Sequence, residues 1–250
     1  MSGWLRLAHQ TAIITGAGSG IGRSVALALA GQKCNLLLTD VHSESLAKVV
    51  SECTKVIPNS VSVQSSVCNV RDSLEVERAI EKADEIASSA TENGSPSSFS
   101  AASILVNCAG ITRDKRVTNL SNDDWDDVLD VNLKGTFNMC RKFCEPNRVT
   151  ALLKGSDTIE SNSFGGGSII NIGSIVSEYG NMGQVNYAAS KGGVVGLTRS
   201  LAKEMALFSH KVVNIKYDER GGAEAEVPPT IRVNCIQPGE FHSQKRTGGS

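Results

Sequence analysis

The sequence predicts one α/β domain in three layers, with a doubly wound parallel sheet between two layers of helices. Short apolar segments alternate with longer amphipathic ones, which is the pattern of repeated strand-helix-strand units. A glycine-rich segment at 15–22 directly follows the first apolar segment, as expected where a parallel strand turns into a helix. The chain has 250 residues, 40% of them hydrophobic, so it can bury one substantial core and we expect a single domain over 1–250.

Six short apolar segments have the composition of parallel strands that are buried on both faces. We expect strands at 11–15, 35–40, 60–66, 103–107, 168–172 and 231–236. The amphipathic segments between them predict helices at 20–30, 43–52, 72–90, 121–144 and 187–208. Ser121-Asn122-Asp123-Asp124 resembles a capping box, with acids in the first turn where the helix dipole favours them. This acidic cluster therefore predicts a helix start rather than a metal site, and no metal is expected.

Three polar segments interrupt this pattern, at about 91–102, 155–167 and 211–229. Each lies between a helix and the following strand, whereas ligands of parallel sheets bind at the carboxyl ends of the strands. We expect these insertions to be mobile surface loops without a role in the chemistry.

The overall composition excludes several classes of function. Lysine and arginine number 25 against 26 acidic residues, so the chain has no excess of basic charge for a nucleic acid. No apolar run approaches the roughly 20 residues that span a bilayer, and residues 1–10 lack the apolar stretch of a signal peptide. The seven cysteines show no zinc-ligand spacing, which predicts small core residues in a reducing compartment.

The glycine-rich segment has the context of a Rossmann-type dinucleotide site, because it follows a predicted strand and opens a predicted helix. Gly16 allows the tight turn, Gly20 lets the backbone approach a pyrophosphate, and Gly22 lets helix and strand pack closely. We expect the cofactor phosphates at the start of this helix, against Gly16, Ser19, Gly20, Ile21 and Gly22.

Asp40 ends the second predicted strand, about 20 residues beyond the glycine loop, where a carboxylate accepts hydrogen bonds from the adenosine ribose hydroxyls. A 2′-phosphate at this position would face a like charge, and Ser19 supplies no compensating cation. The sequence therefore predicts NAD rather than NADP. Arg23 softens this preference only if it turns toward the ribose, and we expect it to serve the pyrophosphate or solvent.

Four further features follow in order: Asn107-Cys108-Ala109-Gly110, Asn132 in Val-Asn-Leu-Lys-Gly, Ser174, and the pair Tyr187 and Lys191. With the TGxxxGxG loop and the YxxxK spacing, this combination resembles the short-chain dehydrogenase/reductase superfamily from about Leu7 to Gly239. The resemblance implies cofactor contacts for Asn107, Ala109, Gly110, Tyr187, Lys191, Pro238 and Gly239. It also places Asn69 and Val70 at the adenine edge, with asparagine where the family usually has aspartate.

The resemblance implies the catalytic roles as well. Tyr187 is the general acid in carbonyl reduction and the base in alcohol oxidation. Lys191, four residues later on the same helix face, binds the nicotinamide ribose, and with the oxidised nicotinamide it is expected to lower the phenol pKa. A lowering by about 3 units corresponds to roughly 4 kcal/mol. Ser174 holds the substrate oxygen, and Asn132 holds a water that links Lys191 to solvent.

We therefore expect an NAD-dependent oxidoreductase that interconverts a ketone and a secondary alcohol. The motifs are similar to those of the 3-oxoacyl-[acyl-carrier-protein] reductases and related hydroxysteroid dehydrogenases, so an acyl thioester of CoA or acyl carrier protein and a 17-beta-hydroxysteroid stay open as substrates. By the same resemblance we expect oligomers through helices 121–144 and 187–208 and the mitochondrial matrix, with the cytoplasm as the alternative.

The alternative function is a truncated, weakly active subunit that binds cofactor and stabilises a partner chain of the same family. Members of the family continue past the position of Gly239 through substrate-covering helices and a seventh strand, whereas residues 241–250 are polar. Two alternatives stay open: the sequence is a fragment or variant product, or the chain lacks that strand and the lid.

Overall fold

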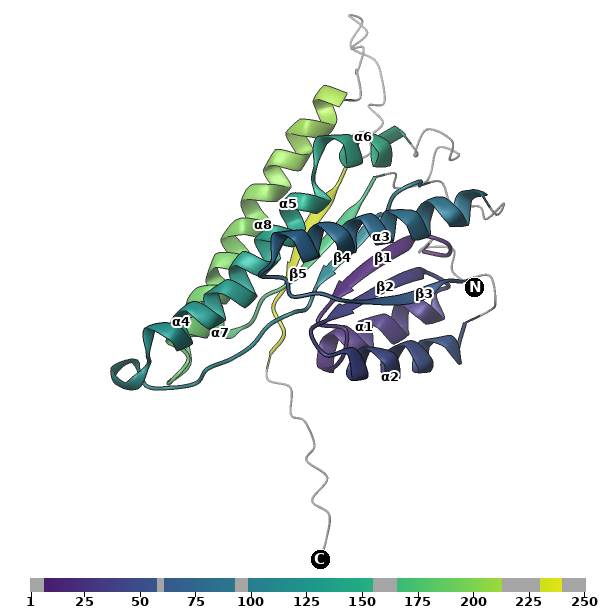
Figure 1. The fold of residues 1–250 in the computed structure, drawn as a ribbon. Helices are drawn as coiled ribbons and strands as arrows, with labels where there is room; N and C mark the ends of the chain where they lie inside the picture. Colours follow the sequence, from purple (N-terminus) through teal and green to yellow (C-terminus); the bar gives the residue numbers. More distant parts are fainter. Residues whose placement is uncertain (1–6, 58–60, 93–98, 155–165, 213–229, 240–250) are drawn as a thin grey trace, which may run out of the picture.

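The computed structural model describes residues 7–57, 61–92, 99–154, 166–212 and 230–239, and Figure 1 shows their arrangement. Six strands form one sheet in the order β3-β2-β1-β4-β5-β6, and every neighbouring pair is parallel. They are β1 (Thr11–Thr15), β2 (Asn35–Asp40), β3 (Val63–Val67), β4 (Ile104–Asn107), β5 (Ser168–Ile172) and β6 (Arg232–Ile236). The strand order reverses between β1 and β4, which in open α/β sheets marks a ligand crevice beyond the carboxyl ends.

The helices cover both faces of this sheet (Figure 1). They are α1 (Gly20–Gly31), α2 (Ser43–Thr54), α3 (Ser73–Glu92), α4 (Asn122–Leu129), α5 (Gly135–Phe143), α6 (Pro146–Lys154), α7 (Val176–Tyr179) and α8 (Val185–Val212). Two shorter elements are the 3-10 turn η1 (Val117–Asn119) and the π-helical turn η2 (Asp130–Lys134).

Successive residues of the central strands point to opposite faces, which produces two cores. Ile13 and Leu37 lie in one core with side chains of α3, α5, α6 and α8. Ile14 and Leu38 lie in the other core with side chains of α1 and α2. The predicted three-layer, doubly wound parallel sheet is confirmed.

The helix predicted as continuous over 121–144 is wrong. The structure divides this segment into α4, η2 and α5, and the wider π turn carries the fully buried Asn132. The pattern of apolar residues does not distinguish a helix from a helix that contains one π turn. The start of the segment is confirmed as a cap, because the Ser121 hydroxyl accepts a hydrogen bond from the Asp124 amide at 3.1 Å.

The insertion predicted at 91–102 is not wholly a surface loop. Helix α3 extends to Glu92, and Phe99, Ala101 and Ala102 are buried in the core of α3 and α5. The segment is rich in serine, so its composition predicts a loop although it contains these buried apolar residues. Of the other two insertions, residues 166–167 and 211–212 are described. The remaining residues of these insertions lie outside the described part, as does everything after Gly239.

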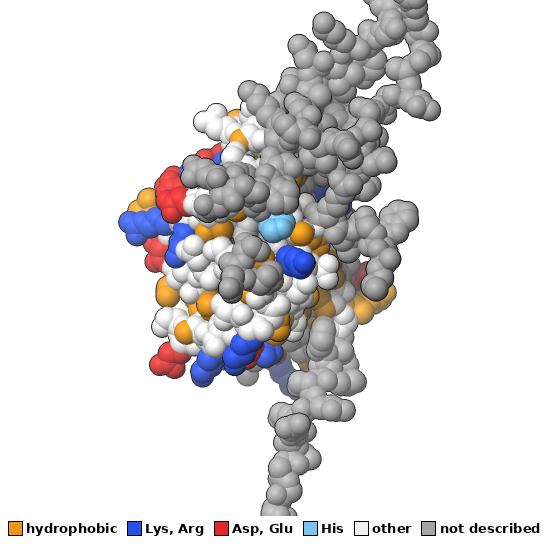
Figure 2. All heavy atoms as spheres, turned by 90° about the vertical axis from the view of Figure 1, so that its right-hand side faces the viewer, with side chains coloured by type: hydrophobic (Ala, Val, Ile, Leu, Met, Phe, Trp, Pro, Cys, Tyr) orange, Lys and Arg blue, Asp and Glu red, His pale blue; other side chains and the backbone are white. Residues whose placement is uncertain are grey.

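The cysteine prediction is confirmed as far as packing is concerned, because all seven thiols are free and each is buried or half-buried. Burial raises the pKa to about 12 for Cys34, Cys68, Cys108, Cys140 and Cys144. Within the described residues, no cluster of potential metal ligands is present, and no helix is long and apolar enough to cross a membrane. Figure 2 shows that basic and acidic side chains both occur on the face it presents.

Candidate active site

The glycine loop joins β1 to α1, and its glycines are required by the packing. Gly16 has a φ of +62°, and a Cβ there would lie 2.8 Å from the Ala109 Cα. A Cβ on Gly22 would lie 2.2 Å from the Gly16 carbonyl oxygen. Gly20 has a φ of +52°, and a Cβ there would meet no atom within 4 Å. Its backbone therefore borders open space at the start of α1. The loop therefore has the shape that the sequence predicts for a phosphate cradle.

Asp40, at the end of β2, is held against this loop by two backbone amides. Its Oδ2 accepts a hydrogen bond from the Gly18 amide at 3.0 Å, and its Oδ1 accepts one from the His42 amide at 3.1 Å. Each carboxylate oxygen keeps further acceptor capacity for a ribose hydroxyl. A Cβ on Gly18 would lie 2.9 Å from Oδ2, so Gly18 is a site residue that the sequence reasoning missed.

Arg23 was expected to serve the pyrophosphate or solvent, and in the structure its guanidinium turns toward α2 instead of the pyrophosphate site. Its guanidinium forms an ion pair with Glu52 of α2 at 2.8 Å, with both side chains partly exposed. The carboxylate of Asp40 therefore lacks compensation by Arg23.

Asn69 and Val70, expected at the adenine edge, follow β3. The Asn69 Oδ1 accepts a hydrogen bond from the Arg71 amide at 3.1 Å, which leaves this oxygen capacity for one more donor. The Val70 side chain is buried in the core, and its carbonyl accepts a hydrogen bond from the Asn138 amide group at 2.9 Å. Only the backbone and Asn69 can therefore face a ligand here.

Thr15, the last residue of β1, joins the glycine loop to the end of β4. Its buried hydroxyl accepts hydrogen bonds from the backbone amides of Cys108 and Ala109, both at 3.1 Å. Thr15 is the first residue of the TGxxxGxG motif, and the sequence alone did not predict this role for it. Its position immediately before the first glycine is the signal that identifies it.

Asn107 lies inside the protein rather than at its surface. Its Nδ2 donates to the Asn171 Oδ1 of β5 at 2.8 Å, and the Asn171 Nδ2 donates to the Thr198 hydroxyl of α8 at 2.9 Å. These buried amides connect β4, β5 and α8 beneath the site. Gly110, three residues on, is adjacent to the reacting groups, since a Cβ there would lie 3.6 Å from the Lys191 Nζ.

The side chain of Asn132 is occupied by contacts within the chain. Its Oδ1 accepts from the Ile111 amide at 2.8 Å, and its Nδ2 donates to the Ile111 carbonyl at 3.0 Å and to the Ser190 hydroxyl at 3.1 Å. Its backbone carbonyl accepts from the Thr136 hydroxyl at 2.7 Å. The amide thus joins the segment after β4 to α8. The second acceptor site of Oδ1 and the backbone carbonyl can each still accept from a water, so the expected water contact stays a prediction.

Ser174 and Tyr187 meet at the carboxyl end of β5. The Ser174 hydroxyl accepts a hydrogen bond from the Val176 amide at 3.2 Å, and it lies close enough to the Tyr187 phenol to lower the pKa of that phenol. Burial raises the pKa of Tyr187, the Ser174 hydrogen bond lowers it, and the charge of Asp114 raises it further. The net direction for the chain alone is upward. The expected lowering includes the positive charge of the oxidised nicotinamide, so it stays a prediction.

Lys191 lies beside the phenol, 5.7 Å from its Nζ to the centroid of the Tyr187 ring. Its side chain is 4% exposed, and its ammonium donates to the Ile172 carbonyl at 2.6 Å. Burial lowers the pKa of Lys191 to about 8. The predicted proximity of this pair is present, but the low-dielectric surroundings disfavour both charged forms.

Pro238 and Gly239 are the last described residues of the site in the sequence. The Pro238 carbonyl accepts a hydrogen bond from the Ile175 amide at 3.2 Å, which ties the segment after β6 to the one that carries Ser174. Gly239 is exposed. The predicted residues from all six strand ends therefore lie along one edge of the sheet, with a proton donor beside a buried ammonium.

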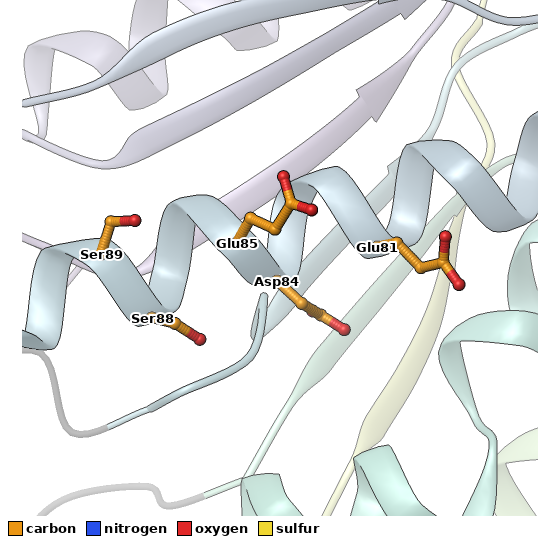
Figure 3. Close-up of a pocket in the computed structure, with 5 residues that line it drawn as sticks. All are labelled: Glu81, Asp84, Glu85, Ser88 and Ser89. Carbon is orange, nitrogen blue, oxygen red and sulfur yellow. The ribbon is translucent and has the colours of Figure 1, made fainter.

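A shallow pocket on α3 lies elsewhere and is shown in Figure 3. Glu81, Asp84 and Glu85 line it with Ser88 and Ser89. Asp84 is paired with Arg148 at 2.7 Å and accepts from the Ala102 amide at 2.9 Å, two residues before β4 begins. This pocket is therefore at the amino end of the strands, opposite the candidate active site.

A family model for short chain dehydrogenases matches residues 10–217. A 3-oxoacyl-[acyl-carrier-protein] reductase of Thermotoga maritima is 36% identical over 235 residues, which cover 94% of this chain and 75% of that protein. A (3R)-3-hydroxyacyl-CoA dehydrogenase of Rattus norvegicus is 36% identical over 205 residues, covering 82% of this chain and 71% of that protein. A solved short chain dehydrogenase from Mycobacterium smegmatis, 23% identical, superposes with a TM-score of 0.70 over 96% of this chain and 80% of its own, which supports the fold.

Proposed function

We propose, from the premise that the chain belongs to the short-chain dehydrogenase family and is an oxidoreductase, that it interconverts a 3-oxoacyl and a 3-hydroxyacyl thioester. The names of the two relatives support this substrate class, because both act on the 3-position of an acyl thioester. The observation that carries the proposal is the position of the Tyr187 phenol, with the buried Lys191 ammonium 5.7 Å from the centroid of its ring and Ser174 near enough to lower its pKa.

In the proposed reduction, the substrate carbonyl oxygen lies between the hydroxyls of Ser174 and Tyr187. A nicotinamide cofactor, when bound, would supply the hydride that the carbonyl carbon needs. Tyr187 gives its proton to the oxygen, and Ser174 holds that oxygen in line with the phenol. The raised pKa of Tyr187 keeps the phenol protonated at neutral pH, which is the form that reduction needs. The Lys191 ammonium stabilises the phenolate that remains until it is reprotonated.

We propose NAD as the cofactor. The Asp40 carboxylate is fixed by two amides at the end of β2, where its charge repels a 2′-phosphate and its oxygens can accept from ribose hydroxyls. The nearby cation Arg23 is paired with Glu52. The test is the ratio of kcat/KM for NADH and NADPH, in the wild-type protein and in Asp40→Ala. We expect NADH to be preferred and the preference to fall at least tenfold in the variant, and an unchanged ratio would exclude this role of Asp40.

The substrate is tested by NADH oxidation with acetoacetyl-CoA and, separately, with estrone, alongside a titration of NADH binding. We expect turnover with acetoacetyl-CoA. Turnover with estrone alone would assign the chain to hydroxysteroids. NADH binding without turnover on either compound would instead favour the weakly active subunit that stabilises a partner.

A further inference from the structure

Residues 111–116, which follow β4, are fastened to the start of α8 by hydrogen bonds that join distant parts of the sequence. The Lys115 amide donates to the Gly183 carbonyl at 2.8 Å. The Gln184 side chain donates to the Asp114 carboxylate at 2.9 Å. The 111–116 segment is therefore held beside the turn of α8 that carries Tyr187.

Asn186, the residue before Tyr187, is fully buried and joins three segments. Its Nδ2 donates to the carbonyls of Arg113 and Asp124, both at 3.2 Å. Its Oδ1 accepts from the Tyr187 amide at 2.8 Å. Both of its donor hydrogens and one acceptor site are thus in use. The Tyr187 amide belongs to the first turn of α8, where amides lack an intrahelical acceptor, so Asn186 supplies the missing partner.

The carbonyl of Tyr187 is held from the other side. It accepts from the Ser190 hydroxyl at 2.8 Å, and Ser190 in turn accepts from Asn132 at 3.1 Å. Asn132 also binds both backbone groups of Ile111. The two buried asparagines therefore connect opposite ends of one short segment, 111–113, to the backbone of Tyr187.

We propose that Asn186 is a positioning residue, which fixes the backbone of Tyr187 against segment 111–116 and α4 and so sets the place of the phenol. The inference rests on the proposed role of Tyr187 as proton donor. A phenol hydroxyl stands at the end of a long rigid side chain, so a small rotation of the backbone moves it away from Ser174. A misplacement of about 1 Å in a catalytic group costs on the order of 100-fold in rate.

The pKa of the Tyr187 phenol is a second readout of its position. Its neighbours with charge or hydrogen-bonding groups are Ser174, Asp114 and Lys191, and burial is the largest cause of its raised pKa. If Asn186 is removed, the first turn of α8 loosens and water reaches the phenol. The pKa of Tyr187 then falls toward its ordinary value.

The experiment compares Asn186→Ala with Asn35→Ala in a protein that also carries Tyr179→Phe and Tyr217→Phe, so that Tyr187 is the single tyrosine of the chain. Asn35 is the matched control, since it is 1% exposed and joins the His9 carbonyl and the Ser62 amide at the amino end of β2. Phenolate absorbance gives the titration midpoint of Tyr187, acetoacetyl-CoA reduction gives kcat, and NADH titration gives Kd.

For Asn186→Ala we expect kcat to fall at least tenfold, the Kd for NADH to change less than twofold, and the Tyr187 midpoint to fall toward the ordinary tyrosine value. Asn35→Ala should leave the midpoint and kcat unchanged. A kcat and a midpoint in Asn186→Ala that match those of Asn35→Ala would overturn the proposal. The milder variant Asn186→Ser should change both quantities in the same direction and decides the matter if Asn186→Ala fails to fold. The midpoint does not depend on turnover, so an inactive wild-type protein would refute the proposed function and leave this test intact.

Discussion

Lys191 offers a direct test of the electrostatics at the site, through the variant Lys191→Met. The ammonium is 4% exposed and donates to the Ile172 carbonyl rather than to a carboxylate. Burial lowers its pKa from 10.5 to about 8, which at about 1.4 kcal/mol per pKa unit corresponds to roughly 3 kcal/mol of destabilisation at pH 7. Loss of the partner of the Ile172 carbonyl in the variant costs about 1 to 2 kcal/mol. We therefore expect Lys191→Met to be more stable than the wild type at pH 7 by about 1 to 2 kcal/mol, and to lack activity.

The pH dependence follows from the same lowered pKa. Between the folded pKa of about 8 and the ordinary value of 10.5, the unfolded chain binds more protons than the folded one. The free energy of unfolding therefore rises with pH through this window, by about 1.4 kcal/mol between pH 7 and pH 9. Lys191→Met lacks this contribution. The charge of Lys191 lowers the pKa of the Cys108 and Cys235 thiols, so in the variant these two pKa values rise further above the ordinary thiol value, and the other buried thiols titrate alike in both proteins.

The assay is urea unfolding of both proteins at pH 7 and pH 9, with circular dichroism as the probe of the unfolding transition. We expect the stability advantage of Lys191→Met to shrink by about 1.4 kcal/mol between the two pH values. Parallel pH dependence in the two proteins would show that Lys191 has an ordinary pKa and would refute the burial argument.

Three other predictions concern neighbouring residues. Thr15→Val should destabilise the fold by about 1 to 3 kcal/mol, because two buried amides lose their acceptor, and urea unfolding against Thr118→Val, an exposed control, measures the difference. Gly22→Ala should prevent NADH binding or folding, since its Cβ would lie 2.2 Å from the Gly16 carbonyl oxygen; a variant that folds and binds NADH normally in a fluorescence titration would contradict the loop geometry. Asp114→Asn should lower the pKa of Tyr187, because the carboxylate charge raises it. The rise of the alcohol-oxidation rate with pH should therefore move to lower pH. An unchanged pH profile would show that Asp114 does not affect the pKa of Tyr187.

Much of the fold was predictable because parallel strands and glycine turns have local signatures. The bounds expected for β1, β2 and β5 agree with the structure residue for residue. The π turn was not predictable, since one extra residue in a helical turn leaves the apolar pattern almost unchanged. Helix α6 was missed too, although Pro146 at its first position is a favourable start signal.

The candidate site likewise has features that the sequence predicts and features that it does not. Spacing along α8 predicts that Lys191 lies near Tyr187, and the structure confirms this proximity. Spacing carries no information on burial, which depends on packing between distant elements, and burial is the largest cause of the raised pKa of Tyr187 in the chain alone. Gly18 and Asn186 were missed for a related reason, because Gly18 binds Asp40 and the Asn186 Nδ2 binds the carbonyls of Arg113 and Asp124, all 22 residues or more away in the sequence.

The central claim is that Tyr187 transfers the proton in a nicotinamide-dependent reduction of an acyl thioester. The most direct measurement is acetoacetyl-CoA reduction by the wild type and by Tyr187→Phe, with the Kd for NADH determined for both. We predict turnover by the wild type, a loss of kcat on the order of 100-fold or more in the variant, and an NADH Kd that agrees within twofold. Substantial turnover by Tyr187→Phe would contradict the account.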